Sequence, residues 1–341
     1  MSARPMRRLY IALVVGTGLG VVLLLLVLRQ MDTGAVWQAL MGIEPRRMLA
    51  VLAVTVLIQF TRPWRWWLMF PRDERPGFVT CFGVLAIANM VNFLVPAVRG
   101  GELLRWLLIR HRGAAPRRST ALATLGVEKL LDLVAVLAIV DVALLGASVP
   151  AWLTATAATV NVLLLAALVA FALLRTRPSW VSGMIHWATV LIPLQRLRDA
   201  VRRAANALSG ALHTLTSRHM LIGMSAMTVV VWVGQTVLVQ LLAWATRTPL
   251  SFLDSLMVVG IVSLGTLVPS APGFIGTWEF FSVAALQLAG MELQAAIALS
   301  LVIHGWQFVV AMARGLIWMA ISGFSVSQLR EDLRQVEASK P

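Results

Sequence analysis

Three charged residues lie together in one apolar stretch of this chain. Glu128 and Asp132 are four residues apart and therefore share one face of a predicted helix, and Lys129 lies three residues before Asp132. Two carboxylates on one buried face can bind a cation or relay a proton, or they can form ion pairs that hold helices together. We interpret Glu128, Lys129 and Asp132 as part of a binding site, because packing alone rarely demands three charges in an apolar stretch.

Two other apolar stretches are interrupted by similar sequences, one in each half of the chain. The first break spans 92–105 (NFLVPAVRGGELLR) and the second spans 267–279 (LVPSAPGFIGTWE). In both, proline ends a helix and a glycine-rich turn leads into a new helix near a glutamate. The new helix directs unpaired N–H groups, the positive end of its dipole, at the break. In a membrane, a matched pair of broken helices indicates a transport site.

The first break carries candidate binding residues of both signs. Arg99 near the start of a half-helix suits a phosphate, and Asn89 and Asn92 add neutral donors and acceptors. Glu102 and Arg105 are three residues apart and can pair. Alternatively, Glu102 caps the half-helix while the arginines reach the membrane interface. The candidate binding residues of this region are Asn89, Asn92, Arg99, Gly100, Glu102 and Arg105.

The second break contributes Ser270, Gly273, Gly276 and Glu279 as candidates, through backbone N–H groups, a hydroxyl and a carboxylate. Glu279 has a simpler alternative role, the stabilisation of a helix dipole.

Arg65 is a further candidate, although the mixture of tryptophan and arginine around it, 62–67 (RPWRWW), is typical mainly of an interface anchor. His304 and Gln307 are three residues apart in the last apolar stretch. A lone buried histidine is more often structural, so we leave this pair out of the predicted site.

The composition indicates a polytopic membrane protein. Of 341 residues, 59% are hydrophobic and 13% charged, whereas a soluble domain carries roughly 25% charge. A single cysteine excludes an internal disulfide and a cysteine-based metal site, and the five histidines lack metal-ligand spacing. The chain has no phosphate-binding loop of the GxxxxGK[ST] type and no recognisable nucleophile. We therefore predict a protein that is not an enzyme and holds neither a metal nor another cofactor.

The apolar segments are 9–28, 48–70, 78–98, 119–146, 151–174, 220–246, 252–268, 275–290 and 294–322. The piece 103–109 rises only about 10 Å, too little for a membrane core of roughly 30 Å. We therefore predict that 78–109 is a re-entrant hairpin, and by analogy 252–290 is another, although two full spans fit there equally well. The predicted fold is an all-α membrane protein with about six full spans and two oppositely oriented hairpins, an inverted repeat.

The positive charges predict the orientation. Lysine and arginine number 29 against 15 acids, and an N-terminus inside the cell leaves most arginines on the cytoplasmic side. Residues 1–322 then form one domain, in which 175–219 is a basic, amphipathic cytoplasmic linker, and 323–341 is a cytoplasmic tail. Both termini are predicted to be cytoplasmic. The cations flank apolar spans, so we expect contact with anionic lipids and not with nucleic acid.

Several motifs, in this order along the chain, resemble the lysylphosphatidylglycerol synthase transmembrane (flippase-like) family. They are Arg65-Trp66, 92–96 (NFLVP) with 100–105 (GGELLR), 128–132 (EKLLD) and 269–279 (PSAPGFIGTWE). The chain departs from the family pattern at 271–274 (APGF), where many members have Ser-Pro-Gly-Gly, and at 99–102 (RGGE), where Leu-Gly-Asp or Leu-Gly-Glu is common. Both departures leave the identity of the substrate open.

The resemblance implies a bacterial inner-membrane protein with two re-entrant hairpins that moves a lipid between leaflets. The aminoacyl transferase that follows this domain in bifunctional members is missing here, so we do not expect lipid aminoacylation. Some standalone relatives are associated with hopanoids. The alternatives are a membrane scaffold for a lipid-modifying enzyme and a membrane-embedded enzyme that uses Glu128 and Asp132. The expected partners are membrane lipids, a second copy of the chain and a lipid-biosynthesis enzyme.

Overall fold

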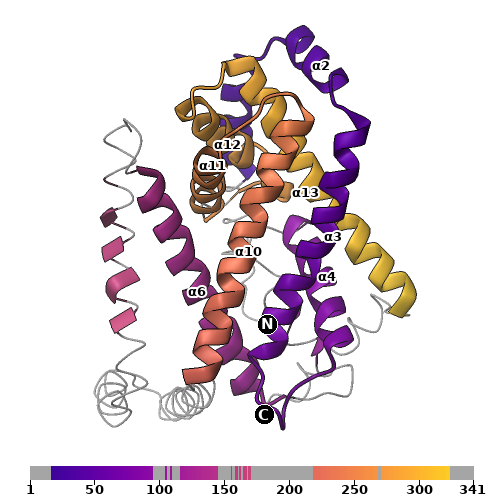
Figure 1. Ribbon diagram of the computed structural model, residues 1–341, viewed down its shortest axis with the longest axis vertical. Helices are drawn as coiled ribbons and strands as arrows, with labels where there is room; N and C mark the ends of the chain where they lie inside the picture. The colour runs from indigo at the N-terminus through magenta and orange to yellow at the C-terminus, as the bar shows by residue number, and fades with distance from the viewer. Residues whose placement is uncertain are drawn as a thin grey trace, which may run out of the picture.

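The computed structural model describes residues 17–94, 104–105, 108–109, 116–144, 155, 158–159, 161–162, 164–166, 168–169, 218–267 and 270–322. Every regular element within these residues is a helix, as predicted from the sequence (Figure 1). The predicted tail 323–341 lies outside the described residues, as does the linker 175–219 except for the first residues of α10. The helices are Thr17–Leu28, α2 (Thr33–Met41), α3 (Pro45–Leu68), α4 (Phe78–Leu94), α6 (Arg118–Leu144), α10 (Arg218–Ala245), α11 (Phe252–Gly265), the 3-10 turn η2 (Pro272–Phe274), α12 (Thr277–Leu288) and α13 (Leu293–Ser322).

Two of the described helices are long and apolar enough to cross a membrane, Met220–Ala245 and Leu293–Ser322. A third candidate span is formed by Thr17–Leu28 and α2 together, which are bent by 88° at the break between them. α3 and α6 contain 24 and 27 residues but carry several charges, and α4 and α11 are shorter apolar helices. The described residues therefore support a helical membrane protein with two or three apolar spans, and the total of about six stays a prediction.

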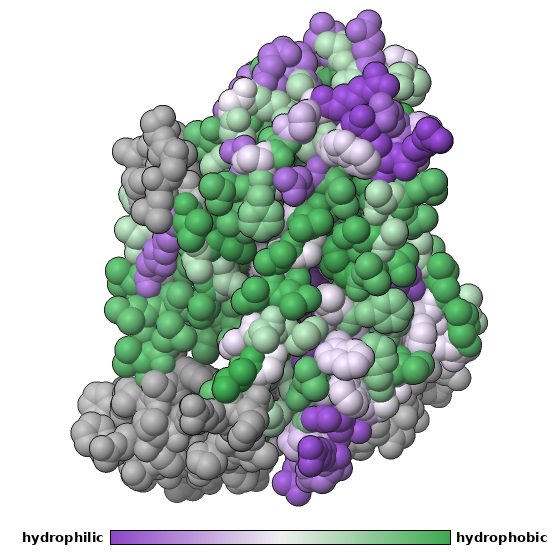
Figure 2. Space-filling model, in the orientation of Figure 1, coloured by the Kyte–Doolittle hydropathy of each residue, from purple (hydrophilic) through white to green (hydrophobic). Residues whose placement is uncertain are grey.

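Polar residues lie at two opposite ends of the molecule. Near the start of α3, Glu44 pairs with Arg247, which follows α10, with 2.9 Å between Oε1 and Nη2. Beyond the other end of α3, Glu74 pairs with Arg117 at the start of α6, with 3.4 Å between Oε1 and Nε. Figure 2 shows a band of hydrophobic side chains between hydrophilic ends on the visible face. This arrangement is that of a protein whose middle lies in lipid.

α13 packs closely on α4 because glycine residues at the contact leave room for the neighbouring helix. A Cβ atom on Gly83 of α4 would lie 1.7 Å from Nε1 of Trp318, and one on Gly315 would lie 2.6 Å from Cβ of Met90. The backbones can therefore approach closely, a common device between helices in membranes. Through this contact α13, in the C-terminal half of the chain, packs against α4, the helix before the first break.

The second break is a compact turn between α11 and α12. Gly273 and Gly276 have φ angles of +73° and +84°, a region that residues with a Cβ rarely adopt. A Cβ on Gly276 would lie 1.8 Å from the carbonyl oxygen of Gly20, so the helix Thr17–Leu28 rests directly on this turn. Glycine is needed at position 276 for its backbone angle and also for this close contact.

Replacing Gly276 and Gly290 by alanine separates these two requirements. Gly290 also has a positive φ, +82°, but nothing lies within 4 Å of the position a Cβ would take. We expect Gly290→Ala to cost about 1–2 kcal/mol from backbone strain alone. Gly276→Ala should cost roughly 1–3 kcal/mol more, because the methyl group overlaps a backbone oxygen. Thermal unfolding of the detergent-solubilised protein measures both, and equal losses would contradict the close contact.

Candidate functional site

Arg65 of α3 is completely buried, 0% exposed, and binds two carboxylates of α6. Its Nη1 donates to Oδ1 of Asp132 at 2.6 Å, and its Nη2 donates to Oδ2 of Asp132 at 3.2 Å and to Oε1 of Glu128 at 3.3 Å. Nη1 also donates to the hydroxyl of Thr228 on α10 at 3.1 Å. One guanidinium group therefore holds α3, α6 and α10 together.

Arg105 joins the same group from the segment that follows the first break. Its Nη1 donates to Oε2 of Glu128 at 2.7 Å, and its guanidinium lies 5.5 Å from the ring centre of Trp66. Two arginines thus balance two carboxylates, and we call Arg65, Arg105, Glu128 and Asp132 the buried charge cluster. We predicted that Arg105 pairs with Glu102, which lies outside the described residues. In the structure Arg105 pairs with Glu128.

The interpretation of residues 62–67 as mainly an interface anchor is wrong for its central residues. Trp66 is 1% exposed and donates its Nε1–H to the hydroxyl of Thr124, and Arg65 is equally buried. Only Trp64, 48% exposed, faces outward as an interface tryptophan would. Helix α3 therefore turns one side of this motif to the protein interior and the other side to the surroundings.

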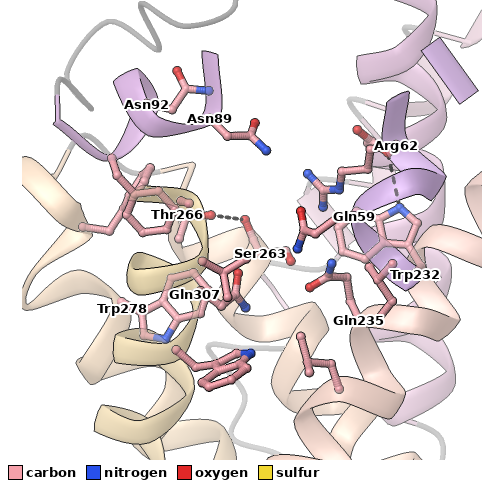
Figure 3. A pocket seen from close by; sticks show the side chains of 18 of the residues that line it. Gln59, Arg62, Asn89, Asn92, Trp232, Gln235, Ser263, Thr266, Trp278 and Gln307 are labelled. Atoms are coloured by element: carbon pink, nitrogen blue, oxygen red, sulfur yellow. Dashed lines mark hydrogen bonds between the residues drawn. The ribbon is translucent and has the colours of Figure 1, made fainter. Parts of the chain in front are cut away.

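A cavity of about 560 Å³ lies beside the buried charge cluster (Figure 3). It is lined by residues of α3, α4, α6, α10, α11, α12 and α13 and of the turn around η2, and Asp132 contributes to both the cluster and the cavity wall. The polar, charged and tryptophan residues that line it are Thr55, Gln59, Arg62, Asn89, Asn92, Lys129, Asp132, Trp232, Gln235, Ser263, Thr266, Trp278, Trp306, Gln307 and Arg314.

The cavity contains some of the residues that the sequence predicted. Asn89, Asn92, Lys129 and Asp132 line it. The rest of the buried charge cluster is not among the lining residues, nor are the four candidates of the second break, Ser270, Gly273, Gly276 and Glu279. Arg99, Gly100 and Glu102 lie outside the described residues. The sequence thus identified one wall of the cavity and part of its support.

Residues from α3 and α13 were missed as parts of the cavity lining. Thr55, Gln59 and Arg62 follow one another at steps of four and three residues along α3, so they share one face of this helix. Gln307 and Arg314 are seven residues apart on α13, again on one face. A polar stripe at helical spacing in an apolar segment is a signal that could have identified both sets.

A second set of buried polar contacts holds the second break against α13. His304 places Nδ1 2.5 Å from Oε1 of Glu279, and its Nε2 lies 2.7 Å from the carbonyl oxygen of Gly273. The N–H of Gly276 donates to Oε2 of Glu279 at 2.7 Å, and the indole of Trp278 stacks on the histidine at 4.9 Å. His304, which the sequence analysis left out, therefore determines where this turn lies.

The hydrogen-bond partners of His304 determine which of its ring nitrogens carries a hydrogen. A carbonyl oxygen only accepts, so Nε2 of His304 carries a hydrogen that it donates to Gly273. At 2.5 Å, the contact between Nδ1 and the carboxylate of Glu279 then holds one proton between the two atoms. Glu279 accepts one further hydrogen bond, from Gly276, so both of its oxygens are used within the protein.

The two broken stretches meet next to the cavity. Phe93, near the end of α4, packs edge-on against Phe274 of the second break, with 5.7 Å between ring centres, and both residues line the cavity. Phe93 also lies 6.3 Å from the ring of His304. Among the residues that the structure describes, no group of three or more histidine, cysteine or acidic side chains could hold a metal ion.

Comparison with known protein families finds a match over residues 11–315, to the family described as "Lysylphosphatidylglycerol synthase TM region". The match covers nearly the whole chain and agrees with the resemblance seen in the motifs. No curated protein and no solved structure matches the chain.

Removing one carboxylate from the buried charge cluster should strongly destabilise the protein. Glu128→Gln leaves two buried arginines with a single counter-charge, and breaking a buried pair in this way costs about 3–5 kcal/mol. Glu44→Gln is the matched control, because Glu44 pairs with two arginines at the exposed end of the molecule, where such pairs contribute about 1 kcal/mol or less.

Unfolding of both variants in detergent measures the difference. Adding Arg105→Gln to Glu128→Gln should recover part of the loss, since the two residues are coupled through a direct contact. Equal stability of the Glu128 and Glu44 variants would contradict a supporting role for the cluster.

Proposed function

Because this chain belongs to the family of lysylphosphatidylglycerol synthase TM regions, we propose that it translocates a lipid with a charged headgroup between the leaflets of the bacterial inner membrane. The headgroup passes through the cavity between the two broken stretches, while the acyl chains stay in the surrounding lipid. The lipid leaves chemically unchanged.

The cavity is the observation that carries this proposal. A charged group that enters the hydrocarbon core without partners loses its hydration at a cost of several kcal/mol. A space of about 560 Å³ lined by Arg62, Lys129, Asp132 and Arg314, between helices that bury their charges in pairs, offers a polar route at membrane depth. A scaffold that only recruits another protein has no need of such a space.

Contacts at the end of the molecule that contains Glu74 and Arg117 support the proposed first hairpin. The backbone N–H of Arg117 donates to the carboxylate of Glu74 at 2.9 Å, so the segment between these residues begins and ends on the same side. Within that segment α4 contains 17 residues, which rise about 26 Å. The piece 103–109 is too short to cross the membrane alone. A hairpin that returns to its side of entry explains both this short length and the contact between Glu74 and Arg117.

Helix lengths support the proposed second hairpin. α11 and α12 contain 14 and 12 residues and rise about 21 and 18 Å, less than a membrane core of roughly 30 Å. They lie against each other, since a Cβ on Gly265 would come 2.2 Å from the ring of Phe281. Two hairpins whose breaks meet at Phe93 and Phe274 agree with the proposed inverted repeat.

Cysteine labelling tests this topology. In a Cys81→Ala background, we expect Asp73→Cys and Arg117→Cys to react with a membrane-impermeant maleimide from the cytoplasmic side, and Pro249→Cys to react from the outside. The labelling is done on intact spheroplasts and on inverted vesicles. A hairpin at 78–109 requires the first two positions to share a side, and labelling from opposite sides would refute it.

Lipid exchange in proteoliposomes tests the function. Phospholipids labelled on the acyl chain are reconstituted with the protein, and dithionite reduction measures how fast the inner leaflet becomes accessible. Arg62→Gln should slow exchange about tenfold or more, because it removes a charge-assisted contact of about 1.5–3 kcal/mol. Arg247→Gln is the control, because this arginine lies outside the cavity with a side chain 65% exposed.

The rival functions give different results in the same assay. Folded wild-type protein that accelerates exchange of no lipid class above empty vesicles would favour the scaffold. A lipid whose mass changes during the incubation would favour a membrane-embedded enzyme. Exchange is measured with dithionite, and lipid mass is measured by mass spectrometry on parallel vesicles that receive no dithionite.

A further inference from the structure

The hydrogen-bonding groups left over in the cavity are donors. The Nε–H of Arg62 and of Arg314 and the Nε1–H of Trp278 are buried without a partner among the described residues, and all three side chains line the cavity. They belong to α3, α13 and α12, three helices whose side chains meet at the cavity. Unpaired buried donors are unfavourable, and a ligand rich in acceptor atoms would satisfy them.

The charge of the cavity wall also favours a ligand rich in acceptor atoms. Among the described residues that line the cavity, Asp132 is the only carboxylate, and both of its oxygens accept hydrogen bonds from Arg65. The Nε1–H of Trp232 donates to the same carboxylate at 3.3 Å. The negative charge of Asp132 is thus already balanced inside the protein, whereas Arg62 and Arg314 bring further positive charge to the wall.

Two of these cations are held next to each other. Nη1 of Arg314 donates to the side-chain oxygen of Gln59, which lies one helical turn before Arg62 on α3. In Figure 3 the ends of Gln59 and Arg62 extend into the space that Asn89 and Ser263 face from the opposite side. Neighbouring guanidinium groups with free N–H donors are well suited to a phosphate, which accepts several hydrogen bonds at once.

The rest of the polar wall suits hydroxyl groups. Gln59, Gln235 and Gln307 line the cavity with neutral amides that both donate and accept, as a hydroxyl does. Trp278 and Trp306 add flat apolar surfaces beside them. The volume of about 560 Å³ lies within the roughly 300–1,000 Å³ of sites that enclose small organic ligands, so a phosphate alone would leave much of it empty.

We propose that this cavity selects lipids whose headgroup joins a phosphate to a hydroxyl-bearing group and carries no amine. This selectivity rests on the proposed function, because it names the headgroup that the translocation pathway accepts. The phosphate binds at Arg62 and Arg314, and the hydroxyl groups bind the glutamines. An ammonium group would face these cations, and the one carboxylate among the described lining residues, Asp132, is occupied by Arg65.

Binding in detergent tests the selectivity without depending on transport. The purified full chain is titrated with short-chain phosphatidylglycerol and phosphatidylinositol as anionic hydroxylated headgroups, and with phosphatidylethanolamine and lysylphosphatidylglycerol as amine-bearing ones. Thermal stabilisation should give a Kd at least tenfold lower for the first two. Equal or tighter binding of either amine-bearing lipid would overturn the proposal.

A soluble ligand of the same chemistry is tested in parallel. Glycerol 1-phosphate and inositol 1-phosphate carry the phosphate and the hydroxyls without acyl chains, and should bind at least tenfold more weakly than the corresponding lipids. Binding as tight as that of the lipids would show that the cavity serves a free phosphate ester, which overturns the lipid assignment.

Variants connect the binding to the named groups. Arg62→Gln and Arg314→Gln should each weaken phosphatidylglycerol binding about tenfold and reduce the preference over lysylphosphatidylglycerol, whereas Arg247→Gln at the exposed end should change neither. Trp278→Phe keeps an aromatic ring beside His304 and removes the spare donor together with the second ring of the indole. It should weaken phosphatidylglycerol binding several-fold, and it covers the case in which an arginine variant does not fold. Unchanged affinity in all folded cavity variants would overturn the proposal.

Exchange measurements distinguish the proposed headgroup selectivity from the proposed translocation. Selective binding of phosphatidylglycerol without any exchange would support the headgroup assignment and contradict translocation. Exchange of phosphatidylethanolamine or lysylphosphatidylglycerol as fast as that of phosphatidylglycerol would support translocation and overturn the headgroup selectivity.

Discussion

The structure depends most on the need to satisfy a guanidinium group that has no access to water. Arg65 is buried between helices, and in an apolar interior such a charge is tolerated only with hydrogen-bonded counter-charges. Glu128 and Asp132 provide them from α6, and Thr228 adds a contact from α10. The positions of three helices relative to one another follow from this one requirement. The cavity lies beside the cluster, and Asp132 belongs to both.

The same requirement decides what the acidic residues do. Glu128 and Asp132 accept hydrogen bonds from arginines, and Glu279 accepts from Gly276 and shares a proton with His304. These carboxylates support the walls and the turn around the cavity. A role for Glu128 and Asp132 in binding a cation, one of the alternatives that the sequence left open, would require Arg65 to release them. In the proposed function, the headgroup therefore meets mainly Arg62, Arg314 and the amides that line the cavity.

The two breaks contribute in different ways. The second break uses glycine for its backbone angles and histidine for its position, and its Phe274 reaches the cavity wall together with Phe93 from the first. The N–H of Gly276 is directed at Glu279, and the carbonyl oxygen of Gly273 is directed at His304. A broken helix near a site thus serves as a wall and a support, in addition to offering N–H groups to a ligand.

The sequence by itself determined the class of protein, most of the described helices, the position of the second break and the family. These depend on composition, on local periodicity and on what proline and glycine do to the backbone next to them. It also placed Glu128 and Asp132 on one face, because a separation of four residues has the same meaning in any helix. Only the tertiary structure decided which charge pairs with which. Arg65 and Glu128 are 63 residues apart, and His304 and Gly273 are 31 apart. Such partners are chosen by helix packing, which also decided that Arg62 and Arg314 face one cavity while Arg65 supports its wall.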